Sequence, residues 1–124
     1  MKISKLMTQP VRRIDAGLTT LEVAEVIVGE GVRSLLVTNG ENPIGILTQD
    51  DIILGRKGRL EETRVRDVMA TAISTIDKDA THEDAIKTMI ENGVRRLLVT
   101  DKGRSVGIFT ISDVTKHVPV STIV

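Results

Sequence analysis

The chain has 124 residues, 40% of them hydrophobic, which suffices for one packed domain or for one domain made of two fused halves. Seventeen basic residues balance seventeen acidic ones, so a broadly basic nucleic-acid surface is not expected. The absence of cysteine excludes disulfides, thiolate metal sites and cysteine nucleophiles. No apolar run approaches the roughly 20 residues of a membrane span and no signal-peptide pattern opens the chain, so we expect a soluble cytoplasmic protein.

Aromatic residues are nearly absent, since the chain holds one Phe and neither Tyr nor Trp. Proteins that bind single-stranded nucleic acids stack the bases on aromatic rings, and this chain cannot build such a platform. Any base that it binds must therefore lie between aliphatic side chains.

The sequence repeats itself at an offset of 62 residues, the separation of Gly45 from Gly107. The match needs no gap between Ile3 and Ile53. The stretches that recur include Gly31-Val32-Arg33 as Gly93-Val94-Arg95 and Leu35-Leu36-Val37-Thr38 as Leu97-Leu98-Val99-Thr100. A tandem repeat of one supersecondary unit indicates that neither half is complete alone. We therefore predict two domains, residues 1–58 and 59–124, that together form one module.

Each half predicts the element order β-α-β-β-α after an opening helical turn at residues 3–7 or 65–69. The strands are predicted over 11–14, 34–38 and 44–48 in the first half, and over 73–76, 96–100 and 106–110 in the second. The second helix of each half begins at Gln49 or Ile111, and segment 55–64 connects the halves. Residues 118–124 are expected to pack on the body of the protein or on a partner.

The first helix of each half carries a start signal and a stop signal. Thr19 and Glu22 have the spacing of a capping box, in which a hydroxyl and a carboxylate satisfy free backbone N–H groups. Thr81 and Asp84 repeat this pair, and a glycine follows each helix where a left-handed stop is required. The predicted apolar faces are Leu21, Ala24, Ile27 and Val28 in one helix and Ala85, Ile86, Met89 and Ile90 in the other.

Gly107-Ile108-Phe109-Thr110-Ile111-Ser112-Asp113 and its twin Gly45-Ile46-Leu47-Thr48-Gln49-Asp50-Asp51 run from a strand through a hydroxyl into a helix start. Because side chains alternate along a strand, Ile108 and Thr110 share one face, and they border an open groove if helices cover the opposite face. Asp113 can accept hydrogen bonds from both hydroxyls of a ribose, and the free backbone N–H groups at the helix start favour a nearby phosphate. The alternative is that Thr110 and Asp113 only cap the helix. Two copies of the motif favour a binding site.

Other polar residues give weaker signals. Arg33 and Arg95 precede the central strands, where an arginine can clamp a phosphate or pair with a surface carboxylate. His82 and His117 are isolated and are expected at the surface or in a cap. The Asp50-Asp51 pair stands at a helix start, where adjacent side chains point apart, so no metal site is predicted. No catalytic arrangement emerges, and an enzyme is not expected.

Together, Val65-Arg66-Asp67-Val68-Met69, residues 93–101 and residues 107–113, with their partners in the first half, resemble cystathionine-β-synthase (CBS) domains. The whole chain resembles a stand-alone tandem CBS pair, or Bateman module. The resemblance implies an α+β fold of two β-α-β-β-α units with pseudo-two-fold symmetry and sheets packed together. It also implies a non-catalytic regulatory sensor that binds adenosine nucleotides (AMP, ADP or ATP) in the cleft between the repeats, commonly as a homodimer that acts on a regulated protein.

The resemblance further implies two nucleotide sites, in each of which an aspartate holds the ribose and apolar side chains enclose the adenine. One site takes Val11, Val32, Arg33, Ser34, Arg95, Ile108, Thr110, Ser112 and Asp113. The other takes Ile46, Thr48, Asp50, Asp51, Ile73, Val94 and Arg96. Asp50 stands where the first site has Ser112, and its charge repels a phosphate by on the order of 1 kcal/mol or more. The Asp113 site is therefore expected to bind AMP or ATP more tightly.

Three alternatives stay open at this point. The chain can be a ligand-free protein–protein interaction module, or a CBS pair that binds S-adenosylmethionine. It can also bind nucleic acid through Arg12-Arg13, Arg33 and the Arg56-Lys57-Arg59 stretch, although the zero net charge and the missing aromatics argue against this. No catalytic cofactor and no membrane partner are expected.

Overall fold

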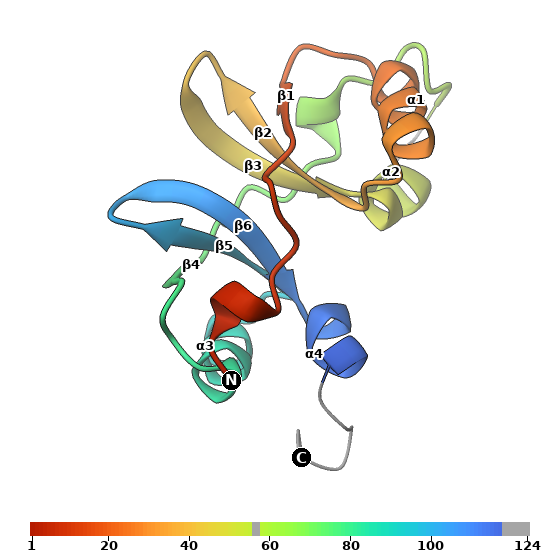
Figure 1. Ribbon diagram of the computed structural model, residues 1–124. Helices are drawn as coiled ribbons and strands as arrows, with labels where there is room; N and C mark the ends of the chain where they lie inside the picture. The colour runs from red at the N-terminus through yellow and green to blue at the C-terminus, as the bar shows by residue number, and fades with distance from the viewer. Residues whose placement is uncertain (56–57, 118–124) are drawn as a thin grey trace. The chain divides into compact units, whose positions relative to one another are not determined.

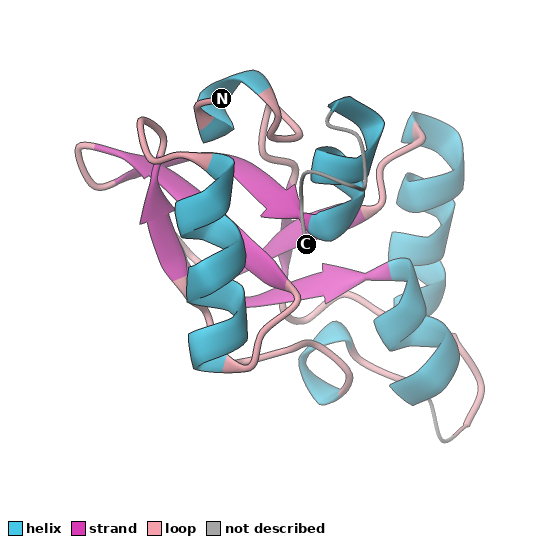
Figure 2. Cartoon of the chain, turned by 90° about the horizontal axis from the view of Figure 1, so that it is seen from below, coloured by secondary structure: helices cyan, strands magenta, loops and turns pink. Residues whose placement is uncertain are grey.

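The computed structural model describes residues 1–55 and 58–117. Within these ranges the chain has the predicted α+β class, with two three-stranded sheets and α-helices that follow the strands in both halves (Figures 1 and 2). The predictions made for residues 118–124, for Arg56-Lys57 in the basic stretch and for the side chain of His117 lie outside the described residues. No helix in the described ranges is long and apolar enough to cross a membrane.

The predicted order β-α-β-β-α is confirmed in both halves. The first half contains the 3-10 turn η1 (Ile3–Lys5), β1 (Arg13–Asp15), α1 (Thr20–Glu30), β2 (Ser34–Asn39), β3 (Asn42–Thr48) and α2 (Gln49–Gly55). The second half contains η2 (Val65–Asp67), β4 (Thr75–Asp77), α3 (His82–Asn92), β5 (Arg96–Asp101), β6 (Arg104–Thr110) and α4 (Ile111–His117). Helices α2 and α4 begin at the predicted residues.

Both sheets have the same strand order and the same register. β1 runs parallel to β2 and β2 antiparallel to β3, and β4, β5 and β6 repeat this arrangement. Leu36 stands opposite Ile46 in one sheet, and Leu98 stands opposite Ile108 in the other. The edge strands β1 and β4 begin two residues later than predicted, because only three residues of each pair with the central strand.

The chain forms two compact units that do not coincide with the sequence repeats. One unit joins Met1–Val11 to the chain from Ser74 onward, and we call it the Asp113 unit. The other comprises Arg12–Ile73, and we call it the Asp51 unit. The opening segment of each repeat thus belongs to the unit that holds the later elements of the other repeat.

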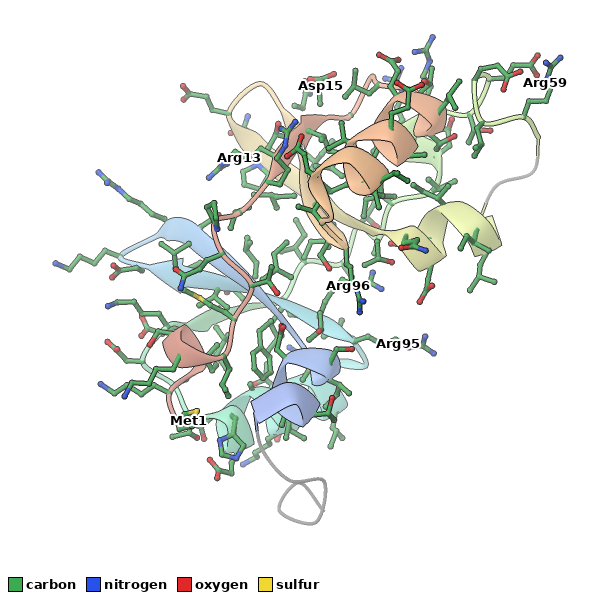
Figure 3. All side chains as sticks on the ribbon, turned by 45° about the vertical axis from the view of Figure 1, so that its right-hand side comes forward. Met1, Arg13, Asp15, Arg59, Arg95 and Arg96 are labelled. Carbon is green, nitrogen blue, oxygen red and sulfur yellow. The ribbon has the colours of Figure 1, made fainter. Side chains whose placement is uncertain are left out.

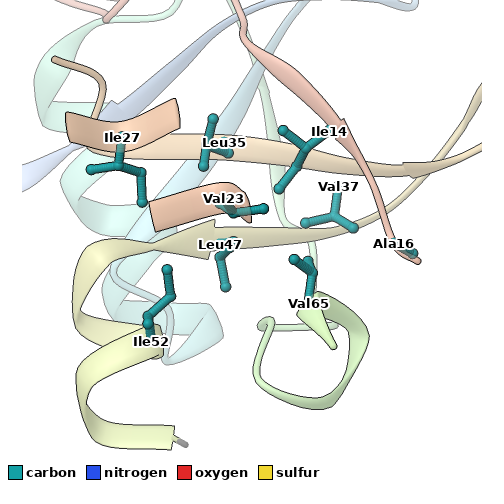
Figure 4. Packing of buried hydrophobic residues seen from close by; sticks show 9 residues of the cluster. All are labelled: Ile14, Ala16, Val23, Ile27, Leu35, Val37, Leu47, Ile52 and Val65. Atoms are coloured by element: carbon teal, nitrogen blue, oxygen red, sulfur yellow. The ribbon is translucent and has the colours of Figure 1, made fainter. Parts of the chain in front are cut away.

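Hydrophobic burial explains this exchange of opening segments. Ile3 and Leu6, in and after η1, are buried in one core with Phe109 of β6. In the Asp51 unit, Val65 of η2 is buried in one core with Leu47 of β3 and with side chains of α1 (Figure 4). Full burial of a large aliphatic side chain contributes about 1.5–3 kcal/mol, so these residues anchor each opening segment in its unit.

The signals predicted at the ends of α1 and α3 are confirmed. The hydroxyl of Thr19 accepts from the Glu22 backbone N–H at 3.2 Å, and Thr81 accepts from Asp84 at the same distance. Both capping boxes are complete. The glycines that follow the helices adopt the left-handed conformation, with φ of 69° and 64°.

The buried faces of α1 and α3 differ from the predicted apolar faces. The buried residues are Thr20, Val23 and Ile27 in α1 and the equivalent His82, Ala85 and Met89 in α3. Leu21, Val28 and Ile90, predicted in the apolar faces, are 38%, 84% and 75% exposed, so the prediction is wrong for them. Apolar residues occur around more than one side of these helices, and periodicity alone does not identify the side that meets the sheet.

Candidate functional site

The repeated motif forms a helix cap at the end of the last strand in both units. In the Asp113 unit, the Thr110 backbone N–H donates to Asp113 Oδ2 at 2.9 Å, and the Thr110 hydroxyl donates to the same oxygen at 3.4 Å. In the Asp51 unit, the Thr48 N–H donates to Asp51 Oδ2 at 2.8 Å, and the Asp51 N–H donates to the Thr48 hydroxyl at 3.3 Å. The capping role, one of the two alternatives open from the sequence, is therefore present in both copies.

Asp113 is buried, with 4% of its surface exposed. Its Oδ1 accepts a hydrogen bond of 3.1 Å from the hydroxyl of Thr8, which belongs to the opening segment of the chain. The backbones of Thr8 and Ile108 exchange two further hydrogen bonds, of 2.9 and 3.1 Å, which hold the opening segment against β6. A buried carboxylate requires hydrogen-bond donors, and Thr8 and Thr110 supply them here.

The equivalent carboxylate of the Asp51 unit has different surroundings. Asp51 is half-buried, and Ala70 stands at the position that Thr8 occupies in the other unit. Ala70 and Ile46 exchange two backbone hydrogen bonds of 2.9 Å, so the backbone arrangement is preserved. Since alanine has no hydroxyl, position 70 offers Asp51 no counterpart of the Thr8 donor.

A glycine in the last strand of each sheet permits this close approach of the opening segment. A Cβ on Gly45 would lie 2.6 Å from the sulfur of Met69 and 3.0 Å from the carbonyl oxygen of Ala70. A Cβ on Gly107 would collide in the same way with the side chain of Met7. A side chain at either position would force the methionine side chain to move and would press on a carbonyl oxygen of the opening segment.

The arginines predicted as phosphate clamps are exposed. Arg33 lies just before β2 and Arg95 just before β5, and Arg95 extends away from the strand in Figure 3. Neither forms an ion pair or hydrogen bond among the described residues. The alternative prediction, that these arginines pair with surface carboxylates, is therefore not seen for Arg33 or Arg95. The guanidinium groups of both residues face solvent.

Arg12, by contrast, is held in an ion pair at the surface. Its guanidinium donates to both carboxylate oxygens of Glu30, at 2.9 and 3.1 Å. The hydrogen bonds from Arg12 lower the pKa of the Glu30 carboxyl below its ordinary value. Arg12 thus lies at the solvated surface, where Glu30 engages its guanidinium.

The predicted site residues divide between the two units. The Asp113 unit holds Val11, Val94, Arg95, Arg96, Ile108, Thr110, Ser112 and Asp113. The Asp51 unit holds Val32, Arg33, Ser34, Ile46, Thr48, Asp50, Asp51 and Ile73. Within each unit, the structure brings the threonine and the aspartate of the motif into direct contact.

The strand residues of the motif are more buried than the sequence suggested. Ile108 and Ile46 are 3% and 2% exposed, so the prediction that they border an open groove is wrong at these two residues. Thr110 and Thr48, at the strand ends, are half-buried. Alternation along a strand establishes which residues share a face, but not what covers that face.

His82 is a further correction, because the sequence predicts it at the surface or in a cap and it is buried, with 7% exposed. Its Nε2 lies 3.1 Å from the Glu83 carboxylate, and its Nδ1 lies 3.3 Å from the amino nitrogen of Met1. The position follows from the repeat, since His82 is the equivalent of Thr20 on the buried face of α1. Across residues 1–55 and 58–117, no three His, Cys, Asp or Glu side chains gather as a metal site would require.

Thr8 is the residue that sequence reasoning missed. The repeat offset places Met7-Thr8 on Met69-Ala70, so a difference between the two copies is visible at this position. The partner of Thr8 is not visible, because Asp113 lies 105 residues away and the contact depends on the exchange of opening segments.

Comparison with known sequences identifies the family. The CBS domain model matches residues 3–57 and again residues 65–120. An uncharacterized protein of Methanopyrus kandleri is 32% identical over 106 residues, which cover 82% of this chain and 54% of that protein. The CBS domain-containing protein YhcV of Bacillus subtilis is 29% identical over 113 residues, which cover 90% of this chain and 81% of YhcV. The chain thus spans about half the length of the Methanopyrus relative.

Solved structures agree with the sequence comparison. The CBS domain protein TA0289 of Thermoplasma acidophilum, of unknown function, superposes with a TM-score of 0.83 at 26% identity and covers 99% of this chain and 72% of that one. The CBS domain protein PAE2072 of Pyrobaculum aerophilum, complexed with AMP, has a TM-score of 0.73 at 19% identity, over 92% and 90% of the chains. The hexameric CBS-CP12 protein of bloom-forming cyanobacteria has a TM-score of 0.82 at 22% identity, over 93% and 69%. Two family matches that span most of the sequence, on a fold shared with these structures, establish that the chain belongs to the CBS domain family as a tandem pair.

Proposed function

We propose that the chain is a non-catalytic regulatory module that binds an adenosine nucleotide (AMP, ADP or ATP) at the Asp113 motif. The observation that carries the proposal is the buried Asp113 carboxylate at the end of β6, beside the hydroxyl of Thr110. Asp113 already accepts the hydroxyl of Thr8, an alcohol donor of the kind that a ribose offers. A ribose diol is matched to a carboxylate, which has two oxygens and about four acceptor positions.

The ligand class has support from a relative of the same fold, since PAE2072 is complexed with AMP. The composition of this chain also restricts how adenine can be held. With one Phe and neither Tyr nor Trp, the base has to pack between aliphatic side chains, of which the half-buried Val11 belongs to the Asp113 unit.

The proposed roles follow the chemistry of the side chains. Asp113 accepts the ribose hydroxyls, and the hydroxyls of Thr110 and Ser112 serve ribose or phosphate. Arg95 is exposed and without an ion pair among the described residues, so its guanidinium is available for a phosphate. Thr48 and Asp51 form a second, weaker site, because the charge of Asp50 opposes a phosphate where Ser112 does not.

The test is calorimetric titration of the purified chain with AMP, beside 2′,3′-dideoxy-AMP as the matched ligand without ribose hydroxyls. AMP should bind and the dideoxy compound should bind at least about tenfold more weakly, the equivalent of 1.4 kcal/mol. Equal binding of both compounds would show that the Asp113 carboxylate does not recognise the ribose hydroxyls. A parallel thermal-shift panel with ADP, ATP and S-adenosylmethionine ranks the adenosyl ligands, since a ligand at 100 times its Kd stabilises by about 2.7 kcal/mol.

A second candidate function is a protein–protein interaction module without a small ligand. The observation in its favour is that Thr110 with Asp113, and Thr48 with Asp51, form helix caps from protein groups, which gives the motif a structural role of its own. A melting temperature that ignores millimolar concentrations of every adenosyl compound in the panel would select this candidate over nucleotide sensing.

We also propose that the module self-associates, as a homodimer, and transmits its ligand state to a regulated protein. Val28 on α1, Leu54 on α2 and Ile90 on α3 are between 75% and 84% exposed, which is unfavourable for apolar side chains in water. The hexameric CBS-CP12 structure gives one assembly of this fold. Sedimentation velocity on the wild type should show a dimer that the substitution Val28→Glu or Ile90→Glu weakens; a monomer at every concentration would contradict the proposal.

A further inference from the structure

The hydrogen bond from Thr8 to Asp113 has a consequence for the proposed site. Asp113 Oδ1 accepts from the Thr8 hydroxyl, and Oδ2 accepts from both the N–H and the hydroxyl of Thr110. A carboxylate offers about four acceptor positions, so protein donors occupy three of them. A ribose brings two hydroxyl donors, and only one position is left for them.

One protein donor must therefore leave if both ribose hydroxyls are to be accepted. The N–H of Thr110 is fixed, because the backbone at this point turns from β6 into α4. The Thr110 hydroxyl donates to Oδ2 at 3.4 Å, so its turn toward a ligand frees a position on that oxygen only and leaves Oδ1 covered by Thr8. The donor to Oδ1 is the hydroxyl of Thr8, which comes from another segment of the chain. Thr8 is exposed to solvent.

Because Thr8 is exposed, moving its hydroxyl away from Asp113 costs little free energy. Its backbone is tied to Ile108 by hydrogen bonds of 2.9 and 3.1 Å, so the opening segment need not move. Rotation of one side chain about χ1 takes the hydroxyl from Asp113 into water, where it keeps a hydrogen-bond partner. Asp113, which is 4% exposed, then has an oxygen open on the side that Thr8 covered.

We propose that Thr8 is an autoinhibitory residue of the Asp113 site: its hydroxyl takes the place of one ribose hydroxyl, and a nucleotide has to displace it to bind. This inference rests on the proposed function. It also gives the two units different behaviour, because Ala70 at the equivalent position cannot compete in this way for Asp51.

The test uses Thr8→Ala, which removes the hydroxyl, clears its place beside Asp113 and gives this position the residue that the Asp51 unit has, with Thr8→Ser as the variant that keeps the hydroxyl. Without nucleotide, Thr8→Ala should melt at a lower temperature than the wild type, because Asp113 loses a donor. In calorimetric titration with AMP it should bind about three- to tenfold more tightly, since no hydrogen bond has to be broken. Thr8→Ser should match the wild type in affinity. Thr88→Val, which removes a hydroxyl on α3 that donates to the Asp84 carbonyl, is the control for unspecific effects on AMP binding.

The outcomes separate the two proposals. If the wild type binds AMP and Thr8→Ala binds it equally or more weakly, Thr8 is not inhibitory and the proposed function stands. If the wild type binds AMP and Thr8→Ala binds it several-fold more tightly, both proposals are supported. If neither binds, the proposed function fails and the role of Thr8 fails with it.

Discussion

The two units share one backbone and differ in the side chains around the carboxylate. Both have the same strand order, the same register and the same pair of backbone hydrogen bonds between an opening segment and the last strand. In the Asp113 unit the carboxylate is buried and receives the hydroxyl of Thr8. In the Asp51 unit the carboxylate is half-buried, with Ala70 in the equivalent place and Asp50 beside it.

The repeat therefore preserves the features that build the sheet and leaves the chemistry of each site free to change. A glycine at position 45 or 107 is required for the close approach of the backbone, so it recurs in both copies. Thr8 and Ala70 contribute their backbones equally to that approach, and their side chains can differ without altering it.

The largest loss of stability is expected from alanine substitution at the equivalent core positions Phe109 and Leu47, which are both fully buried. Phe109→Ala should lower the free energy of unfolding by about 3–5 kcal/mol and Leu47→Ala by about 2–5 kcal/mol, because the larger side chain leaves the larger cavity. Urea denaturation followed by circular dichroism measures both. The prediction fails if Leu47→Ala lowers the free energy of unfolding as much as Phe109→Ala does, or more. That result would show that the core of the Asp51 unit relaxes less around the cavity than the core of the Asp113 unit.

The glycine positions should respond alike, because they serve the shared backbone. Gly107→Ala and Gly45→Ala each place a Cβ against a methionine side chain and close to a carbonyl oxygen of the opening segment. Overpacking of this kind lowers the free energy of unfolding by about 1–3 kcal/mol. Thermal unfolding of the two variants checks the prediction, and a variant that melts like the wild type would mean that its opening segment is not held as closely as described.

The Asp51 unit should become more like the Asp113 unit when a hydroxyl is added. Ala70→Thr places a donor at the position from which Thr8 reaches its aspartate, and should raise the free energy of unfolding by about 0.5–1.5 kcal/mol. A double-mutant cycle with Asp51→Ala isolates the hydrogen bond. Additive effects in the cycle would show that residue 70 does not reach Asp51, and that the two units differ in more than this side chain.

The smallest effect concerns an ion pair that only one unit has. Arg12 lowers the pKa of Glu30 in the folded chain, whereas Asn92 and Ser74 form an uncharged hydrogen bond of 3.3 Å at the equivalent positions. Since the folded pKa of Glu30 is below the unfolded one, the pair stabilises above the unfolded pKa and is lost as the pH falls through the folded pKa. The difference in melting temperature between wild type and Glu30→Gln should therefore be present at neutral pH and vanish in acid.

The control for this pH dependence is Asn92→Ala, whose difference from the wild type should not change over the same range. Both partners of the ion pair are more than 40% exposed, so the effect is small and should fall further in high salt. A difference for Glu30→Gln that persists at the lowest pH would contradict an electrostatic origin.

Much of the fold could be predicted from local rules, because the relevant residues act close to their own position. Thr19 with Glu22, and the glycine after each helix, act within one turn of backbone. The buried face of α1 could not be predicted, because Val28 is as apolar as Val23 and only the position of the sheet decides which is covered. The site shows the same division: the contact of Thr110 with Asp113 spans three residues, while Thr8 joins them only through the exchange of opening segments.

Calorimetric titration of Asp113→Ala and Asp51→Ala with AMP tests the claim that the Asp113 motif, rather than its twin, is the principal nucleotide site. Asp113→Asn and Asp51→Asn serve as variants that keep the side-chain shape, and thermal unfolding verifies that each protein is folded. We predict that the Asp113 variants lose affinity for AMP by about tenfold or more, the equivalent of at least 1.4 kcal/mol, while the Asp51 variants stay close to the wild type. Equal losses from both pairs of variants, or a larger loss from the Asp51 pair, would contradict the claim.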